Sequence, residues 1–259
     1  MNELFTHTSQ ATHTSQASTA LSVNVNKIAL LRNSRGSNYP DLLFFVRNII
    51  ALGAKGITVH PRQDERHVTR QDVRDITELL REHVDIEFNI EGYPSEDFLA
   101  LVSEVHPAQC TLVPDAPDQL TSDHGWDVPA NQALLKTVTA RLRAQNIRSS
   151  LFLDPVPGAV AAARDVGADR IELYTEEYAR AFATANESAV LEQYRATTQR
   201  AAELGLGVNA GHDLNLNNLP HFLQIPGILE VSIGHALIVE SLEQGMEKVI
   251  KKYLQITGG

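Results

Sequence analysis

The sequence predicts a single (β/α)8 barrel, and the main reason is the alternation of two periodicities along the chain. Short runs rich in β-branched and apolar residues alternate with longer segments of helical period, which is typical of parallel βα units. Eight such pairs in about 240 residues match the size of one barrel. An open doubly wound sheet is the alternative, but VNVNKIALLRNSRG, which contains the end of the first expected strand, has no glycine-rich phosphate turn. We therefore expect one barrel domain over residues 21–259.

The expected elements follow one another in pairs. The expected strands are 21–26, 56–61, 85–90, 109–114, 149–154, 170–175, 207–212 and 229–234. The expected helices are 41–53, 69–82, 95–106, 130–145, 157–166, 187–204, 215–223 and 236–255. The helix at 69–82 has the clearest signal, because Thr69 and Asp72 are spaced as a capping box and Val73 and Ile76 fall on one face.

The first twenty residues and the overall composition limit the class of protein. Residues 1–20 repeat THTSQA and carry few large apolar side chains, so we expect a flexible tail. The net charge of −10 disfavours a broad nucleic-acid-binding surface. No stretch approaches the roughly 18 uncharged apolar residues of a membrane span. The single cysteine, Cys110, excludes an internal disulfide. We expect a cytoplasmic protein that binds neither nucleic acid nor membrane.

Polar residues gather where the expected strands end. The active site of a barrel lies at the carboxyl ends of its strands, and burying many polar groups there costs stability unless they face a functional cavity. Seven of the eight strands contribute to this set, whereas one such residue alone is as readily a hydrogen-bonded core group. The residues are Asn24, Asn26, Lys27, His60, Glu87, Asp154, Glu172, Asn209, His212, Gly234 and His235.

The ionisable members of this set favour acid–base chemistry. An imidazole ordinarily titrates near neutrality, so His60 and His212 are candidates for proton transfer, and a desolvated pocket raises the pKa of a carboxyl such as Glu87 towards neutrality. No strand end presents a serine or cysteine nucleophile. Lys27 leaves open a second possibility, a Schiff base with a ketone substrate, beside the simpler role of a cationic contact.

Arginines and glycines at the same end predict anion binding. Arg32, Arg35, Arg62 and Arg66 follow the first two strands, and a guanidinium group binds phosphate with two hydrogen bonds. Gly211 and Gly234 follow the last two strands, at the usual phosphate position of a barrel. Two anion sites suggest one bisphosphate or two phosphorylated substrates, whereas solvated loop charges are the alternative, above all for Arg32 and Arg66.

Taken together, five motifs resemble the pyridoxine 5′-phosphate synthase family. They are VNVNKIALLRNSRG, GITVHPRQDERHVT, LVPD, GVNAGHDLN and IGHALI, in this order along the chain. The resemblance implies a (β/α)8 barrel that forms a homo-octamer. It also implies condensation of 1-deoxy-D-xylulose 5-phosphate with 3-amino-2-oxopropyl phosphate, with release of inorganic phosphate and water, without a metal or an organic cofactor.

The resemblance also implies roles for individual residues. It makes His60 and Glu87 proton acceptors and His212 a proton donor, and Glu172 is an additional pocket candidate from its place in the sixth strand. The implied contacts to the aminooxopropyl phosphate are Asn24, Arg35, Gly234 and His235. The implied contacts to the deoxyxylulose phosphate are Arg62, His67 and Thr121.

Two positions depart from the commoner pattern of the family. Asn26 and Lys27 stand where the family more often has Asp-His, and Asp213 stands where it often has glycine. All three are kept as substrate-binding candidates, although a carboxylate repels a phosphate unless it points away or pairs with a cation.

Two other functions remain open from the residues alone. One is a metal-dependent sugar-phosphate epimerase or aldolase that uses His60, Glu87, Glu172 and His212 as ligands. The other is a barrel that binds a phosphorylated ligand without catalysis.

Overall fold

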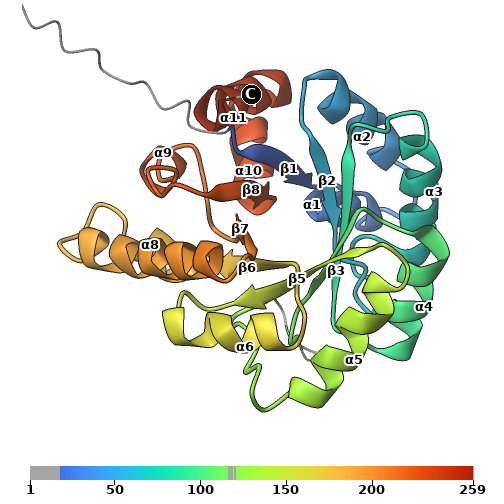
Figure 1. The fold of residues 1–259 in the computed structure, drawn as a ribbon. Coiled ribbons are helices and arrows are strands. Elements are labelled where there is room, and N and C mark those ends of the chain that lie inside the picture. Colours follow the sequence, from blue (N-terminus) through green and yellow to red (C-terminus); the bar gives the residue numbers. More distant parts are fainter. Residues whose placement is uncertain (1–17, 116–118, 120, 259) are drawn as a thin grey trace, which may run out of the picture.

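The computed structural model describes residues 18–115, 119 and 121–258, and they form a closed barrel of eight parallel strands in sequence order (Figure 1). The predicted fold is therefore confirmed. The strands are β1 Ala20–Asn24, β2 Gly56–Val59, β3 Glu87–Gly92, β4 Gln109–Leu112, β5 Arg148–Leu153, β6 Arg170–Tyr174, β7 Gly207–Gly211 and β8 Ile228–Ile233. All eight overlap the strands expected from the sequence.

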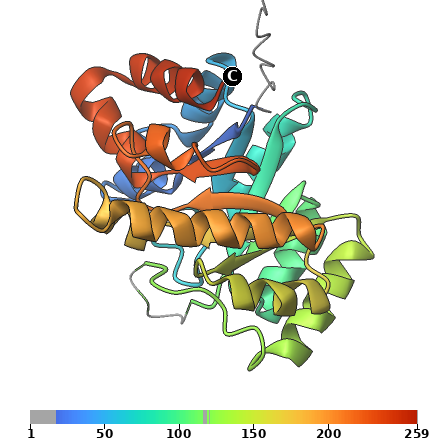
Figure 2. The ribbon, with the colours of Figure 1, turned by 60° about the vertical axis from the view of Figure 1, so that its left-hand side comes forward.

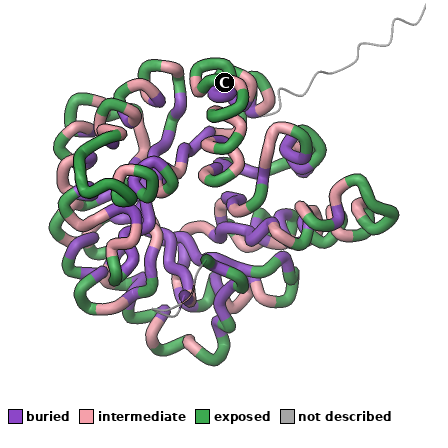
Figure 3. The backbone as a smooth tube through the Cα atoms, turned by 180° about the vertical axis from the view of Figure 1, so that it is seen from behind, coloured by how far each residue is buried: buried purple, intermediate pink, exposed green. Residues whose placement is uncertain are grey.

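Helices surround this barrel, and the exposed residues gather on them while the strands are buried (Figure 3). Their bounds are α1 Asn26–Asn33, α2 Leu42–Ala51, α3 Arg70–Leu80, α4 Glu96–Val105, α5 Gln132–Arg143, α6 Val160–Asp165, α7 Glu176–Ala181, α8 Glu187–Glu203, α9 Leu219–Phe222, α10 His235–Gln244 and α11 Met246–Thr257; a 3-10 turn, η1, spans Pro157–Ala159. The capping box predicted for α3 is present: Thr69 Oγ1 accepts from Asp72 N, and the Asp72 carboxylate accepts from Thr69 N.

The structure corrects four helix expectations. Residues 26–33 form α1, although 21–26 was expected as strand and no helix was expected there. The segment 176–181 is helical as α7. The helix expected at 215–223 is reduced to the four residues of α9. The helix expected at 236–255 is two helices, because Gly245 between α10 and α11 adopts φ +89°, which an α-helix does not tolerate.

The boundary of the expected tail also shifts. Residues 1–17 of that tail lie outside the described residues. Thr19 belongs to the barrel, because its N–H donates to Thr257 O (3.0 Å) and its hydroxyl donates to Ile228 O (2.9 Å). Strand β1 then begins at Ala20 and packs beside α11.

The apolar core lies between the strands and the helices, and it holds the carboxyl ends of the late strands in place. Helix α8 runs beside β7 (Figure 2). Its buried Tyr194 donates through the hydroxyl to Tyr174 O at the end of β6 (2.7 Å). Tyr178 of α7 donates in the same way to Asn218 O (2.7 Å). Buried tyrosines therefore tie the loops after β6 and β7 to the outer helices.

The interior of the barrel is polar rather than filled with branched aliphatic side chains, as barrels more often are. Ser22 and Thr58 share a hydrogen bond of 2.7 Å, and Asn89 Nδ2 donates to Thr58 Oγ1 (3.4 Å). Thr111 Oγ1 lies 3.0 Å from Asn89 Oδ1 and 3.3 Å from Glu172 Oε2. The hydrogen bond from Thr111 across the barrel interior thus gives a partner to Glu172, which belongs to the polar set that the sequence assigned to a site.

Candidate active site

His60 follows β2 directly and lies at the carboxyl end of the barrel. The residue is 7% exposed, and its backbone N–H donates to Asn26 Oδ1 at 2.9 Å. Asn26 begins α1, and its own N–H donates to Asn24 Oδ1 (3.0 Å). The amide of Asn26 therefore fixes the position at which His60 leaves the strand. This is a supporting contact that the sequence analysis did not identify.

Glu91, near the carboxyl end of β3, is the carboxyl group that lies beside His60. Its Oε2 lies 3.9 Å from His60 Nδ1 and 3.5 Å from Asn24 Nδ2. Burial and the neighbouring Glu172 and Asp115 raise the pKa of Glu91 well above its ordinary value. Burial and the nearby Arg62 lower the pKa of His60 well below its ordinary value. Both shifts disfavour the charged forms of the two groups, so they lie side by side without forming a strong ion pair.

The expectation that Glu87 lies with His60 does not fit the structure. Glu87 begins β3 at the opposite, amino-terminal end, where its carboxylate pairs with the Arg148 guanidinium. Side chains alternate along a strand, so Glu87, Asn89 and Glu91 share the inward face. Glu87 and Glu91 lie four positions apart on this face, and the predicted residue, Glu87, is the one at the amino-terminal end of the strand. The alternation in EFNIEG is the signal by which Glu91 could have been found.

Asn209 also departs from its expected place. Its side chain accepts from Arg170 Nη1 (3.0 Å) and donates to Gln109 Oε1 (3.3 Å), and Arg170 in turn lies 3.3 Å from Glu230. These residues form a hydrogen-bonded layer below the site. Asp154 is exposed and accepts from Gly125 N (3.1 Å).

Glu172 lies deeper in the barrel, in the middle of β6. Burial and the nearby Glu230 raise its pKa to about 8. A Cβ atom on Gly211 of β7 would lie 2.4 Å from Glu172 Oε1, so only glycine leaves room for this carboxyl group. Glu172 is therefore a protonated acid near neutral pH, enclosed beneath the His60–Glu91 pair.

His212 comes directly after β7, where the chain turns sharply. His212 and Asp213 adopt φ +79° and +56°, a region that non-glycine residues seldom occupy. The ring of His212 packs edge-on to Tyr174, with centroids 5.0 Å apart. Its Nε2 lies 3.1 Å from Thr121 Oγ1 and its Nδ1 lies 2.8 Å from Asp213 Oδ2.

Arg62 and His67 lie in the loop after β2, but Arg62 is already paired. Its Nη2 donates to Asp115 Oδ2 at 2.6 Å and its Nη1 to Gln119 O at 2.9 Å. His67 Nδ1 accepts from Val68 N (3.0 Å), and burial with the charge of Arg62 lowers the His67 pKa to about 4. His67 is therefore neutral, with its hydrogen on Nε2.

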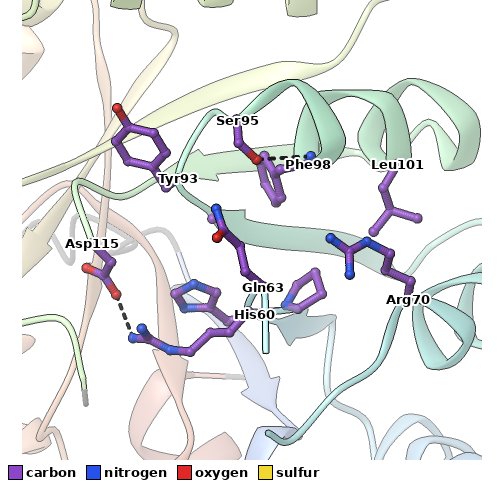
Figure 4. Close-up of a pocket in the computed structure, with 11 residues that line it drawn as sticks. His60, Gln63, Arg70, Tyr93, Ser95, Phe98, Leu101 and Asp115 are labelled. Atoms are coloured by element: carbon purple, nitrogen blue, oxygen red, sulfur yellow. Dashed lines mark hydrogen bonds and ion pairs between the residues drawn. The ribbon is translucent and has the colours of Figure 1, made fainter. Parts of the chain in front are cut away.

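Asp115, which the sequence analysis did not single out, follows β4 and is 4% exposed. Its Oδ2 also accepts from Ser122 Oγ (2.8 Å), while its buried Oδ1 has no hydrogen-bond partner. Asp115 borders a cavity of about 30 Å³ together with His60, Arg62 and Tyr93 (Figure 4). The LVPD motif therefore supplies the carboxylate that orients Arg62 beside His60.

The remaining candidates occupy the rim of the site. Gly234 precedes α10, and a Cβ there would lie 3.1 Å from Asn24 Cβ, so the ends of β8 and β1 approach closely. His235 is the first residue of α10, and the N–H groups of the first turn of a helix can donate to an anion. Lys27 and Arg35 are exposed, on α1 and just after it.

Besides Arg62, two more of the four arginines expected to bind anions are held by carboxylates. Arg32 binds Asp72 through two hydrogen bonds (2.5 and 2.7 Å), and Arg66 Nε donates to Asp64 (2.7 Å). Arg32 thus forms a largely buried ion pair between α1 and α3, whereas Arg66 pairs within its own loop.

Within residues 18–115, 119 and 121–258, no three His, Cys, Asp or Glu side chains gather in a metal-binding arrangement. The ligand set considered for a metal enzyme is not brought together, because Glu87 lies at the far end of the barrel. No helix in this part of the chain is both long and apolar enough to cross a membrane.

The fold and the site define a class: a (β/α)8 barrel enzyme with buried acid–base groups and anion-binding elements at the carboxyl ends of its strands. The sequence profile described as "Pyridoxal phosphate biosynthesis protein PdxJ" matches residues 21–258. The chain belongs to this family.

Curated relatives agree with this assignment. A pyridoxine 5′-phosphate synthase from Christiangramia forsetii is 51% identical over 239 residues, which cover 92% of this chain and 99% of the relative. A second, from Albidiferax ferrireducens, is 48% identical over 92% of this chain and 96% of the relative.

Solved structures resemble the fold at low sequence identity. A mutant tryptophan synthase α-subunit from Pyrococcus furiosus has a TM-score of 0.61 at 15% identity, over 93% of this chain and 98% of that one. An Aquifex aeolicus protein has a TM-score of 0.62 at 14% identity, over 94% and 93% of the two chains. These two similarities concern the barrel alone.

Proposed function

We propose that this chain is a pyridoxine 5′-phosphate synthase of vitamin B6 biosynthesis. It condenses 1-deoxy-D-xylulose 5-phosphate with 3-amino-2-oxopropyl phosphate and releases inorganic phosphate and water. The single observation that carries the proposal is the buried pair of His60 and Glu91, with Nδ1 and Oε2 3.9 Å apart, at the carboxyl end of the barrel. Family membership over residues 21–258 supports it.

The proton-transfer roles follow from the protonation states. His60 is neutral and buried, so it accepts a proton at neutral pH without first losing one. Glu91 takes the role of proton acceptor that was expected of Glu87, because it is the carboxyl group that His60 faces and its raised pKa makes its carboxylate a stronger base. His212 is the proton donor on the opposite side of the barrel mouth. Glu172 lies beneath them and is an additional proton donor, with a pKa of about 8.

The reaction needs several proton transfers in one place. Schiff-base formation, loss of water, loss of phosphate and ring closure each move a proton, and positioned acids and bases accelerate each transfer. The proposed chemistry uses no metal and no organic cofactor. Burial raises the pKa of the Glu91 and Glu172 carboxyl groups towards neutrality, where a carboxyl group exchanges protons most readily.

Two anion-binding regions accommodate the two phosphorylated substrates. Asn24, Arg35, Gly234 and His235 form the proposed site for the aminooxopropyl phosphate, where the free N–H groups of α10 favour a phosphate. Arg62, His67 and Thr121 form the proposed site for the deoxyxylulose phosphate. Lys27 is exposed and adds a positive charge at the rim, which favours a cationic contact over a Schiff base.

The proposed assembly is a homo-octamer in the cytoplasm. Leu31 on α1, Phe44 on α2 and Leu242 on α10 are 55%, 55% and 78% exposed. Helix α1 packs against both α2 and α10, so these apolar side chains lie on neighbouring elements. Such a surface supports contacts between copies of the chain.

The activity is tested by omission of each substrate. Purified protein is incubated with either phosphorylated substrate alone and with both, in the presence and absence of a chelator. Pyridoxine 5′-phosphate is expected only when both substrates are present, at the same rate with chelator. Chelator-sensitive turnover together with stoichiometric bound metal would favour the metal-dependent alternative instead.

A further inference from the structure

His212 and Asp213 form a pair that the proposed reaction does not by itself require. His212 Nδ1 lies 2.8 Å from Asp213 Oδ2, and His212 Nε2 lies 3.1 Å from Thr121 Oγ1. The two ring nitrogens therefore have different partners. One faces a carboxylate of the same turn, and the other faces a residue of the proposed substrate site.

A sharp turn of the backbone brings the side chains of His212 and Asp213 together. Adjacent side chains in a strand point to opposite faces, so they do not meet unless the chain turns. Here both residues adopt positive φ, which costs on the order of 1–3 kcal/mol for each and persists only where the surroundings impose it. Thr175 Oγ1 donates to His212 O, and Asn218 Nδ2 donates to Asp213 O at 3.0 Å. These hydrogen bonds from two other segments hold the turn.

We propose that Asp213 is a positioning residue for His212: its carboxylate keeps the hydrogen on Nδ1, so that Nε2 is the atom that delivers the proton. This deepens the proposed function and rests on it. A hydrogen bond at one ring nitrogen fixes the tautomer and the orientation of an imidazole. The carboxylate also stabilises the imidazolium form, which is the form that donates.

The groups around the pair are consistent with an ionised Asp213. The hydrogen bond from His212 lowers the pKa of Asp213 below its usual range, with further contributions from His235 of α10 and Arg180 of α7. On the other side of the ring, Tyr174 packs edge-on and donates its hydroxyl to Glu176 at 2.7 Å. Asp213 is therefore the carboxylate in hydrogen-bond contact with the imidazole.

The proton transfer balances within this arrangement. In the donating step the Nε2–H bond of the imidazolium breaks, its electron pair stays on nitrogen, and a new O–H bond forms on a leaving hydroxyl of the substrate. The oxygen departs as water. Nδ1 keeps its hydrogen and Asp213 keeps its charge, so the carboxylate orients the donor without itself exchanging a proton.

This assignment also resolves the charge problem at position 213. A carboxylate aimed at a phosphate would repel it, whereas here the side chain is directed to the His212 ring. The backbone N–H of Asp213 remains available to an anion. The side chain and the backbone of one residue therefore serve separate purposes.

The test compares three substitutions at position 213 with one elsewhere. Asp213→Asn and Asp213→Gly both tolerate the positive φ, so both are expected to fold. Asp213→Glu restores the charge. Glu187→Gln is the matched control, because His221 Nδ1 and Glu187 form a similar pair (2.9 Å) away from the site.

The first readout is the ¹⁵N spectrum of the His212 ring without substrate. The parent protein is expected to carry hydrogen on Nδ1 when the ring is neutral, and Asp213→Asn is expected to lose this preference. The spectrum does not depend on turnover, so it distinguishes failure of this proposal from failure of the proposed function. A parent ring with its hydrogen on Nε2 alone would overturn the proposal.

The second readout is the pH dependence of kcat. For Asp213→Asn and Asp213→Gly, kcat is expected to fall on the order of 10- to 100-fold, part of the 10²–10⁴ that a positioned acid contributes. The alkaline limb is expected to move to lower pH, since the donor loses its proton more easily, while KM stays nearly unchanged. Asp213→Glu is expected to have a kcat between that of Asp213→Asn and that of the parent. Glu187→Gln is expected to keep the kcat of the parent. An unchanged pH profile in both Asn and Gly variants would show that only the backbone of residue 213 matters.

Discussion

The protein is expected to become less stable as the pH rises above neutrality, and replacing Glu172 with glutamine is expected to remove a large part of this effect. Glu172 is 3% exposed, lies near Glu230 and accepts a hydrogen bond of 3.3 Å from Thr111. Burial comes first among the causes that raise its pKa to about 8. The folded protein therefore holds a proton that the unfolded chain releases near pH 4.5. Glutamine has nearly the same shape and no charge to bury.

The sign and the size follow from linkage. Because the folded state binds the proton more tightly, the stability contribution of Glu172 is present below pH 4.5 and is lost as pH rises towards 8. Between pH 6 and pH 9 the calculated loss for this group is roughly 3 kcal/mol. The Glu172→Gln variant lacks this loss.

The assay is urea unfolding at pH 6, 7.5 and 9, with both proteins at the same concentration. The free energy of unfolding of the parent is expected to fall by about 3 kcal/mol more than that of Glu172→Gln over this range. Glu82→Gln on the surface is the control and is expected to follow the parent. Equal pH dependence in the parent and in Glu172→Gln would refute the reasoning.

Four further substitutions test the site and its surroundings. Glu91→Gln is expected to lower kcat on the order of 10²–10⁴-fold, while Glu87→Gln leaves kcat nearly unchanged; steady-state kinetics that show the reverse would return the role to Glu87. Arg62→Lys keeps the charge but loses the forked geometry, so KM for deoxyxylulose 5-phosphate is expected to rise about tenfold, and an unchanged KM would exclude the proposed contact. Arg32→Ala is expected to cost about 2 kcal/mol in urea unfolding without changing kcat, because it leaves the half-buried Asp72 without its partner; a loss of activity in the folded variant would contradict this structural role.

The architecture of the barrel was predictable because it depends on local patterns. Short runs rich in β-branched and apolar residues marked all eight strands, and the Thr69 capping box marked the start of α3. Helix α1 was missed because NKIALLRN continues directly from the end of a strand and has no capping residue with a side-chain hydrogen bond. A local pattern of this kind does not show where a strand gives way to a helix.

The site was predictable only as far as residue types allow. His60 and His212 follow their strands in the motifs, and the structure places both at the carboxyl end. Choosing between Glu87 and Glu91 required knowing where β3 begins relative to its neighbours, which depends on pairing with Gly56 and Val59. The Arg62–Asp115 pair joins loops 53 residues apart, so no spacing in the sequence indicates it.

The most direct test of the central claim is the stoichiometry of the reaction. Purified protein is incubated with 1-deoxy-D-xylulose 5-phosphate and 3-amino-2-oxopropyl phosphate, and both pyridoxine 5′-phosphate and inorganic phosphate are quantified over time. One phosphate ion is expected for each molecule of pyridoxine 5′-phosphate formed. A folded protein that forms no pyridoxine 5′-phosphate from the two substrates would contradict the assignment.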